Sequence, residues 1–247
     1  MARRPRNHVD LPLAAGRHLT LPEKVAHHLR QVLRLKAGDE ILLFNGRDGR
    51  EWTARLEEVD RRRVVALVLA DRPALPPPAL PLHLALGISK GDRMDHALQK
   101  AVELGVASVT PLFCRRSVVR LSGERLARKL HHWQGVIIGA CEQSGRGDLP
   151  PLNPPMPLDA WLAQGPPAPT LLLDPQASIT LPELPPPKGL TFLVGPEGGL
   201  SDDERHLALA AGCTAIRLGP RILRTETAPL AALAAAQALW GDFRHAG

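Results

Sequence analysis

Two segments rich in glycine and proline, close to the carboxyl end of the chain, carry the residue types best suited to holding a ligand. Residues 195–204 read GPEGGLSDDE, and residues 218–228 read LGPRILRTETA. Each follows a short apolar run that is typical of a buried strand. Because glycine lets the backbone approach a ligand closely, and binding residues concentrate in loops, the two segments predict a binding site at the ends of two strands.

The acidic end of the first segment has a structural explanation. Ser201 and Glu204 have the spacing of a capping box, in which the serine accepts a hydrogen bond from the first helical turn and the glutamate reaches back. We therefore expect a helix to begin at Ser201. A cap does not require the preceding GPEGG string, so ligand binding is assigned to residues 195–199.

The ligand is not expected to be a nucleoside triphosphate. The chain has neither a Gly-x-Gly-x-x-Gly fingerprint nor a Gly-Lys-Ser/Thr phosphate loop, and Glu197 with three further carboxylates would repel phosphate. A ligand with a neutral adenosine and a cationic centre, such as S-adenosylmethionine, suits glycine loops and carboxylates better.

The elements that would position these segments lie on either side of a proline-rich stretch, residues 73–81 (PALPPPALP). Such a stretch can neither continue a helix nor donate to a sheet interior, so it predicts a stiff connector. Before it, apolar spacing predicts a short helix around residues 25–33, and β-rich runs predict strands at 41–44, 51–59 and 64–69. This module is expected to be a meander or small barrel.

After the connector, predicted strands and helices alternate. Strands are expected at 82–88, 109–113, 171–173 and 191–194, and helices at 92–104, 122–141, around Trp161, and from Ser201 and Thr225. The alternation is typical of an α/β fold with a parallel sheet covered on both faces, whose ligands bind at the carboxyl ends of strands. The predicted domains are residues 1–73 and 82–247, joined by a linker at 74–81.

Composition excludes several classes of protein. The longest apolar tract, residues 228–240, is shorter than a membrane span, and no hydrophobic stretch follows the opening MARRPR, so a cytoplasmic protein is expected. The three cysteines (Cys114, Cys141 and Cys213) are far apart. They therefore do not indicate a disulfide framework. The histidine pairs at 27–28 and 131–132 lack carboxylate or cysteine companions at ligand spacing, so no metal site is expected.

Basic residues concentrate in the first third of the chain. Residues 1–75 hold 15 lysines and arginines against 10 acidic residues, which is +5 of the net charge of +6. Arginines in such a region can follow a phosphate backbone, although a solvated charged face is the alternative. Because the chain has no tyrosine and four residues each of phenylalanine and tryptophan, base stacking is disfavoured and recognition of folded RNA by shape is favoured.

Six strings and one arginine, taken in their order along this chain, resemble one known family. Besides residues 195–201 and 218–227, the strings at 140–146 (ACEQSGR), 90–94 (KGDRM), 99–105 (QKAVELG) and 110–112 (TPL), together with Arg116, are similar to elements of the bacterial small-subunit ribosomal RNA uridine-N3 methyltransferase family. That family belongs to the SPOUT superfamily. The resemblance covers nearly the whole chain.

The resemblance implies an activity and a fold. It implies methylation of N3 of one uridine in the 16S rRNA of the small ribosomal subunit, with S-adenosylmethionine as the cofactor. It also implies a homodimer, a PUA-like RNA-binding β-barrel and a SPOUT-type α/β domain with a deep trefoil knot. Predicted strands and helices alone would give an open doubly wound sheet, because they do not reveal threading. The alanine-rich residues 228–240 either pack in the core or form the subunit contact.

The resemblance also implies roles for individual residues. Arg224 or Arg221 would be the cation beside the uracil oxygens, Glu226 the base or the group that orients that arginine, and Glu197 an organiser of its loop. An ion-pair network at the start of the last helix is the structural alternative for the two arginines and Glu226. The residues implied to hold the cofactor are Leu172, Leu173, Gly195, Glu197, Gly198, Gly199, Leu218, Gly219, Ile222 and Leu223.

Contacts to RNA are expected from two groups of residues, one at the basic amino end and one near the middle of the chain. A solvated surface remains the alternative for both groups. The residues are Arg3, Arg4, Arg6, Arg30, Arg34, Arg115, Arg116, Glu142, Gln143 and Arg146.

Two other functions stay open on the sequence. One is a ribosome-associated RNA-binding protein without catalysis, which the intact glycine segments disfavour. The other is an enzyme acting on a small molecule with the same cofactor, for which the arginine-rich first module has no evident use.

Overall fold

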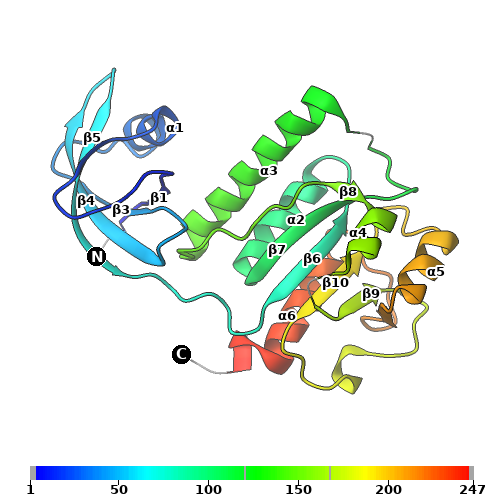
Figure 1. Ribbon diagram of the computed structural model, residues 1–247. Coiled ribbons are helices and arrows are strands. Elements are labelled where there is room, and N and C mark those ends of the chain that lie inside the picture. The colour runs from blue at the N-terminus through cyan, green and yellow to red at the C-terminus, as the bar shows by residue number, and fades with distance from the viewer. Residues whose placement is uncertain (1–3, 120, 167, 245–247) are drawn as a thin grey trace. The chain divides into compact units, whose positions relative to one another are not determined.

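The chain divides into two compact units in a computed structural model that describes residues 4–119, 121–166 and 168–244. The first unit comprises the chain up to Pro77 together with Cys141–Leu149. The second comprises Pro78–Ala140 and the chain from Pro150 onwards (Figure 1). The boundary falls inside the proline-rich stretch. The return of Cys141–Leu149 to the first unit differs from the predicted division, because that segment continues a helix of the second unit and has no break in composition.

The second unit is built on a parallel sheet. Among the described residues it has six strands in the order β11-β9-β10-β6-β7-β8, and each neighbouring pair is parallel. Sheets of this kind are buried on both faces, which explains why the central strands are almost continuously apolar. The strands are β6 (Leu82–Gly87), β7 (Val106–Phe113), β8 (Met156–Pro157), β9 (Thr170–Leu173), β10 (Leu190–Val194) and β11 (Thr214–Ile216).

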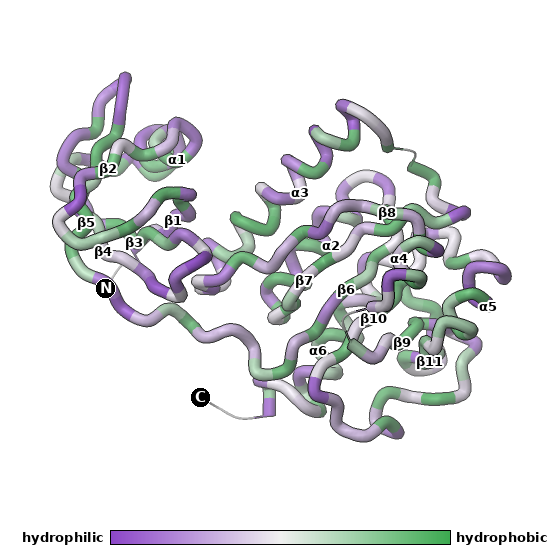
Figure 2. The backbone as a smooth tube through the Cα atoms, in the orientation of Figure 1, coloured by the Kyte–Doolittle hydropathy of each residue, from purple (hydrophilic) through white to green (hydrophobic). Residues whose placement is uncertain are grey.

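Helices connect these strands and pack on the sheet. The helices α4 and α5 contact each other and share a buried cluster with Ala85 and Leu193, whereas α2 and α6 contact each other and the strands β7 and β10. Figure 2 shows hydrophilic and hydrophobic residues interspersed along α3, whose buried residues begin at Trp133. The helices are α2 (Asp92–Glu103), α3 (Gly123–Ser144), α4 (Leu158–Gln164), α5 (Asp202–Ala210) and α6 (Ala228–Trp240), with 3-10 turns at Leu181–Glu183 and Asp242–Arg244.

The predicted capping box at the start of α5 is confirmed. Ser201 Oγ accepts a hydrogen bond from the backbone N–H of Glu204 at 3.3 Å, and the Glu204 carboxylate accepts one from the backbone N–H of Ser201 at 2.8 Å. The helix therefore begins directly after the first glycine-rich segment and leaves residues 195–200 as a loop at the carboxyl end of β10.

The first unit contains a separate sheet. Its five described strands have the order β1-β3-β4-β5-β2, in which β1 pairs with β3 in parallel and the other pairs are antiparallel. The strands are β1 (Arg6–His8), β2 (His18–Thr20), β3 (Glu40–Phe44), β4 (Arg50–Val59) and β5 (Val64–Pro73). The predicted short helix is α1 (Glu23–His27), continued by a π-helical turn over His28–Val32.

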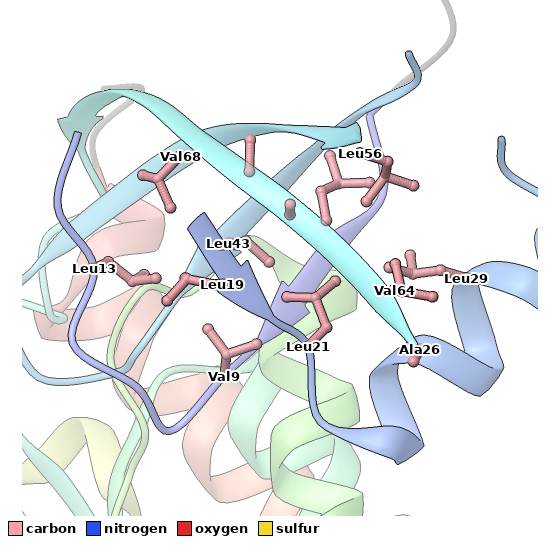
Figure 3. Close-up of a cluster of buried hydrophobic side chains, with 13 residues drawn as sticks. Val9, Leu13, Leu19, Leu21, Ala26, Leu29, Leu43, Leu56, Val64 and Val68 are labelled. Carbon is pink, nitrogen blue, oxygen red and sulfur yellow. The ribbon is translucent and has the colours of Figure 1, made fainter. Parts of the chain in front are cut away.

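One cluster of aliphatic side chains forms the core of this unit. The side chains come from the strands, from α1 and from the connecting segments, and they gather against one face of the sheet (Figure 3). Alternation along β5 explains the arrangement, because every second residue of a strand points to the same face. The cluster contains Val9, Leu13, Leu19, Leu21, Ala26, Leu29, Ile41, Leu43, Ala54, Leu56, Val64, Ala66 and Val68.

Arg6 holds Cys141–Leu149 in the first unit. Its Nε donates to the carboxylate of Glu51 at 2.5 Å, and its guanidinium carbon lies 4.7 Å from the centre of the Phe44 ring. The guanidinium also donates to three backbone carbonyls at the end of α3 and just after it: Cys141 at 2.7 Å, Glu142 at 3.2 Å and Arg146 at 3.1 Å. A buried charge is tolerated only when it is paired and hydrogen-bonded, and both conditions are met here.

Replacing Arg6 is expected to destabilise the first unit strongly. The side chains of Arg6 and Glu51 are 4% and 6% exposed, and removing one partner of a buried pair costs about 3–5 kcal/mol. Arg6→Ala should therefore lower the free energy of unfolding by about that amount. Native-state hydrogen exchange of the β3 and β4 amides measures this free energy in the full chain.

Arg4→Ala is the matched control. Arg4 pairs with Glu40 at 2.5 Å, but its side chain is 51% exposed, so its loss should cost about 0–1 kcal/mol. If Arg4→Ala and Arg6→Ala lower the free energy of unfolding by the same amount, the structural role of Arg6 is contradicted.

Candidate functional site

A cavity of about 700 Å³ lies at the carboxyl ends of β9 and β10, where the sequence predicts a binding site. We call residues 195–200 the GPEGG loop and residues 218–227 the LRTE loop. Residues of both loops line the cavity, together with the end of β9. All ten residues expected to hold a cofactor lie in its wall, as do Arg221, Arg224 and Glu226.

The GPEGG loop takes a form that depends on its glycines. A Cβ atom at Gly195 would lie 2.9 Å from the backbone nitrogen of Leu200, which is closer than real Cβ atoms approach. Gly199 has a φ of +67°, a conformation that L residues other than glycine rarely adopt. The loop therefore folds back on itself and presents backbone, without side chains, at these two positions of the cavity.

A hydroxyl group ties the two loops together. Thr225 Oγ1, in the LRTE loop, donates a hydrogen bond to the carbonyl of Gly195 at 2.9 Å. The hydroxyl of Ser89, which follows β6, lies 3.3 Å from Thr225 Oγ1. The ends of β6 and β10 and the segment after β11 therefore meet at one point beside the cavity.

Arg93, near the start of α2, connects the carboxylates of the two loops. Its Nη1 donates to Glu197 Oε1 at 3.1 Å, and its Nε lies 3.9 Å from Glu226 Oε2. The backbone N–H of Lys90 donates to the same oxygen of Glu197 at 2.7 Å. The sequence predicts no role for Arg93, and its place in the KGDRM string is the signal that could have found it.

Two buried carboxylate oxygens at the cavity lack a hydrogen-bond partner among the described residues: Glu197 Oε2 and Glu226 Oε2. Burial alone would raise the pKa of Glu197, but the N–H groups of Lys90 and of Glu197 itself, with the Arg93 guanidinium, outweigh it and lower the pKa below its ordinary value. Glu197 is therefore a carboxylate at neutral pH and can accept another donor.

The basic residues of the LRTE loop are accessible. The side chain of Arg224 is 78% exposed, and its Nη1 lies 4.0 Å from Glu226 Oε1. Arg221 is exposed too, and Ile222 is 84% exposed. A pair this long and this exposed contributes little to stability, so the arginine can turn toward an anionic group that enters the cavity.

The two arginines after β7 have different surroundings. Arg116 lines the cavity, and its Nη1 donates to the carbonyl of Leu200 at 3.1 Å. Arg115 lies beside the first turn of α5, where its guanidinium pairs with Asp203 and its backbone N–H donates to Glu204 Oε1 at 2.7 Å. Asp174 and Arg205, which form an ion pair in the cavity wall, have no role in the sequence prediction.

The remaining residues expected to contact RNA belong to the first unit. Arg6 and Arg146 are 9% and 7% exposed and bind carbonyl or carboxylate oxygens within the unit, so we leave both out of the proposed RNA surface. Glu142 accepts a hydrogen bond from the backbone N–H of His8 at 2.9 Å. Arg3 lies outside the described residues.

Others of this group are more accessible. Arg4 pairs with Glu40 at the surface, and Arg30 donates to the carbonyl of Asp60 at 2.7 Å. Arg34 is exposed and has a φ of +55°. Gln143 is exposed, near the end of α3.

The described residues contain neither a cluster suited to a metal ion nor a helix suited to a membrane. Among them, no group of three or more histidine, cysteine, aspartate or glutamate side chains is arranged to hold a metal ion. Within the same residues, every helix is too short or too polar to cross a bilayer.

The chain is similar to known RNA methyltransferases over both units. Residues 76–237 match the family model of an RNA methyltransferase domain, and residues 21–69 match that of an RNA methyltransferase PUA domain. The fold and the two family models thus define a class, the RNA methyltransferases.

Curated relatives and solved structures narrow the class. Ribosomal RNA small subunit methyltransferase E of Buchnera aphidicola is 32% identical over 96% of this chain and 97% of its own. A structure of the same enzyme from Neisseria gonorrhoeae bound to S-adenosylmethionine has 42% identity and a TM-score of 0.93, covering 98% of this chain and all of that one. A Legionella pneumophila protein in complex with the same cofactor has 39% identity and a TM-score of 0.94, over 98% and 100% of the two chains. The chain belongs to the ribosomal RNA small subunit methyltransferase E family.

The hydrogen bonds of Glu197 predict a pH-dependent contribution to stability. Because folding lowers its pKa, this contribution is fully present above the pKa of the unfolded chain and is lost as the pH falls through that of the folded protein. The difference in melting temperature between the wild type and Glu197→Gln should therefore shrink between about pH 6 and about pH 3.

Glu124→Gln, which removes the charge of an exposed carboxylate on α3, is the control. It measures how the melting temperature changes with pH when an exposed carboxylate is lost. A wild-type advantage over Glu197→Gln that stays constant across this range would show that the carboxylate charge contributes nothing.

Proposed function

We propose that the chain methylates N3 of a uridine in the 16S rRNA of the small ribosomal subunit, with S-adenosylmethionine as the methyl donor. The observation that carries the proposal is the single cavity lined by both the GPEGG and LRTE loops. Its volume lies within the range of sites that hold cofactor-sized ligands, about 300–1,000 Å³. The names of the relatives support the RNA substrate.

The cavity residues fit S-adenosylmethionine. Apolar groups, such as Leu172 and Leu223, and glycine backbone suit the neutral adenosine part. The unpartnered oxygens of Glu197 and Glu226 suit a cation, and this ligand carries both an ammonium and a sulfonium group. When bound, the cofactor supplies a methyl group that a nucleophilic nitrogen can accept. The ten residues expected to hold it are the residues we propose for this role.

The reaction also needs groups that act on the uracil. N3 of uridine carries a proton at neutral pH, and the anion left after its loss has charge on the neighbouring oxygens. We assign Arg224 to these oxygens, because it is exposed and weakly paired, with Arg221 as the alternative cation. Glu226, held between Arg93 and Arg224, either takes the proton or orients Arg224. Arg93 is a positioning residue that holds both loop carboxylates.

Several finer features form part of the proposal. The first unit would be a PUA-like barrel that binds RNA, using Arg4, Arg30, Arg34, Glu142 and Gln143. In the second unit, Arg115 and Arg116 would also contact RNA. The protein would act as a cytoplasmic homodimer with α6 at the subunit contact.

We also propose that the second unit contains the trefoil knot of the SPOUT superfamily. The path after β11 supports this. Arg217 forms a bridge with Thr180 in the connection between β9 and β10, where its N–H donates to the carbonyl of Ile179 at 2.9 Å. The chain then passes Gly195 and enters α6, which packs on α2 and β10.

The product of the reaction tests the proposed function. Small ribosomal subunits that lack the modification are incubated with the protein and labelled S-adenosylmethionine, and mass spectrometry locates the labelled nucleoside. We expect N3-methyluridine at one position of the 16S rRNA. Specific RNA binding without transfer of label would instead favour a binding protein without catalysis, and label on small metabolites would favour a small-molecule enzyme.

Arg224→Ala should lower the rate of methylation about 10²- to 10³-fold, the usual cost of removing a group that stabilises charge in a transition state. Binding of S-adenosylmethionine should change little, because this arginine is assigned to the uracil. Single-turnover kinetics and calorimetry on the same preparation separate the two effects.

Arg128→Ala, at an arginine on α3 with 70% exposure, is the matched control and should leave both properties unchanged. Turnover of Arg224→Ala equal to that of Arg128→Ala would remove Arg224 from the proposed mechanism.

A further inference from the structure

A second cavity, of about 370 Å³, lies in the second unit near the amino ends of three strands. His83 of β6 and Thr191 of β10 are the second residues of their strands, and Ser108 is the third residue of β7. The GPEGG loop follows the opposite, carboxyl end of β10. The second cavity is therefore separate from the proposed methylation site.

A row of polar residues crosses the parallel sheet at this level. Thr191 is in register with Thr170 of β9 on one side and with His83 on the other, and His83 is in register with Ser108. Residues in register point to the same face of a sheet. Polar side chains on four adjacent buried strands are unusual, since such strands are normally apolar, and three of these four line the cavity.

The hydrogen bonds around the cavity leave capacity for a ligand. His83 Nδ1 lies 2.7 Å from Ser108 Oγ, and the amide of Asn153 donates to the hydroxyl of Thr110 at 2.9 Å. Thr191 is 1% exposed, and its hydroxyl has no hydrogen-bond partner among the described residues. Buried hydroxyl groups are normally paired, so this one marks a place where a partner is missing.

The lining also specifies the charge of a ligand. Among the described residues that line the cavity, none is aspartate, glutamate, lysine or arginine. Burial lowers the pKa of His83, so its imidazole is neutral at neutral pH. Hydroxyl, amide and neutral imidazole groups both donate and accept hydrogen bonds, and they match a ligand whose own groups do both. A charged ligand would lose its hydration without gaining a counter-charge.

The spacing of the polar row sets the size of the ligand. Neighbouring strands lie about 4.8 Å apart, so the polar groups of three strands span roughly 10 Å. This is the width of a ring that carries several polar substituents. Trp161 and Met156 add apolar surface beside the row.

We propose that this cavity binds a small uncharged molecule with several hydroxyl or amide groups, of the size of a nucleoside or a monosaccharide. The chemistry shared by these sources is a polar ring without net charge. The proposal does not depend on the methyltransferase activity.

Nuclear magnetic resonance of the full-length protein tests the proposal with uridine, ribose and uridine monophosphate as probes. Uridine should shift the backbone amide signals of His83, Ser108 and Thr191 in a saturable way. If ribose shifts the same signals, the hydroxyl groups are the part of the ligand that the cavity recognises. If only uridine binds, the base is the part that it recognises. The charged monophosphate should bind no better than uridine.

The same spectra contain the outcomes that would overturn the proposal. One is the absence of saturable shifts at these three amides with uridine and with ribose. Uridine shifts confined to residues 195–199 would be another, since they would place the probe in the other cavity. Tighter binding of the monophosphate at these amides would contradict the assignment of an uncharged ligand.

Two matched variants remove one hydroxyl each from the row. Thr191→Val deletes the unpartnered hydroxyl, so it should fold at least as stably as the wild type and bind the probe about three- to tenfold more weakly. Thr170→Val deletes a hydroxyl that donates to the carbonyl of Ala168 at 3.3 Å and does not line the cavity, so probe affinity should be unchanged. Equal affinities for the two folded variants would overturn the role of Thr191 in the site.

Discussion

The candidate site depends on the contact between two loops that are distant in the sheet. β9 lies between β10 and β11, so the segments that follow β10 and β11 would not meet unless the chain returned across β9. The hydrogen bond from Thr225 to the Gly195 carbonyl closes this distance, and Arg93 reaches a carboxylate of each loop. Without these contacts the glycines and the arginines would line different surfaces, and the cavity of about 700 Å³ would have one wall.

The arginines of the chain show how the same side chain takes unlike roles according to burial. Arg6 is buried and binds one carboxylate and three carbonyls, so its charge stabilises the first unit. Arg93 is partly exposed and connects two carboxylates at the cavity. Arg224 is 78% exposed and loosely paired, which leaves it free to meet an incoming anion. Charge composition alone does not separate these cases.

Much of the second unit could be predicted from the sequence, because its strands and helices are marked by apolar periodicity, glycine ends and a capping box. The strands β1, β2, β8 and β11 were missed, since each has only two or three residues and is too short to establish a period. The cavity wall was predicted from the glycines of the GPEGG loop. Arg93 was not, because a pair between α2 and a loop 104 residues away leaves no pattern of spacing, and only its place in the KGDRM string points to it. For the same reason, the burial of Arg6 by the end of α3 could not be foreseen.

Hydrogen–deuterium exchange of the full-length protein, with and without S-adenosylmethionine, tests most directly whether the two loops form one site. The amides of residues 195–199 and of residues 218–225 should both gain protection, at the same ligand concentration, because both loops line the same cavity. Protection of one loop without the other, or of neither at saturating ligand, would contradict the account.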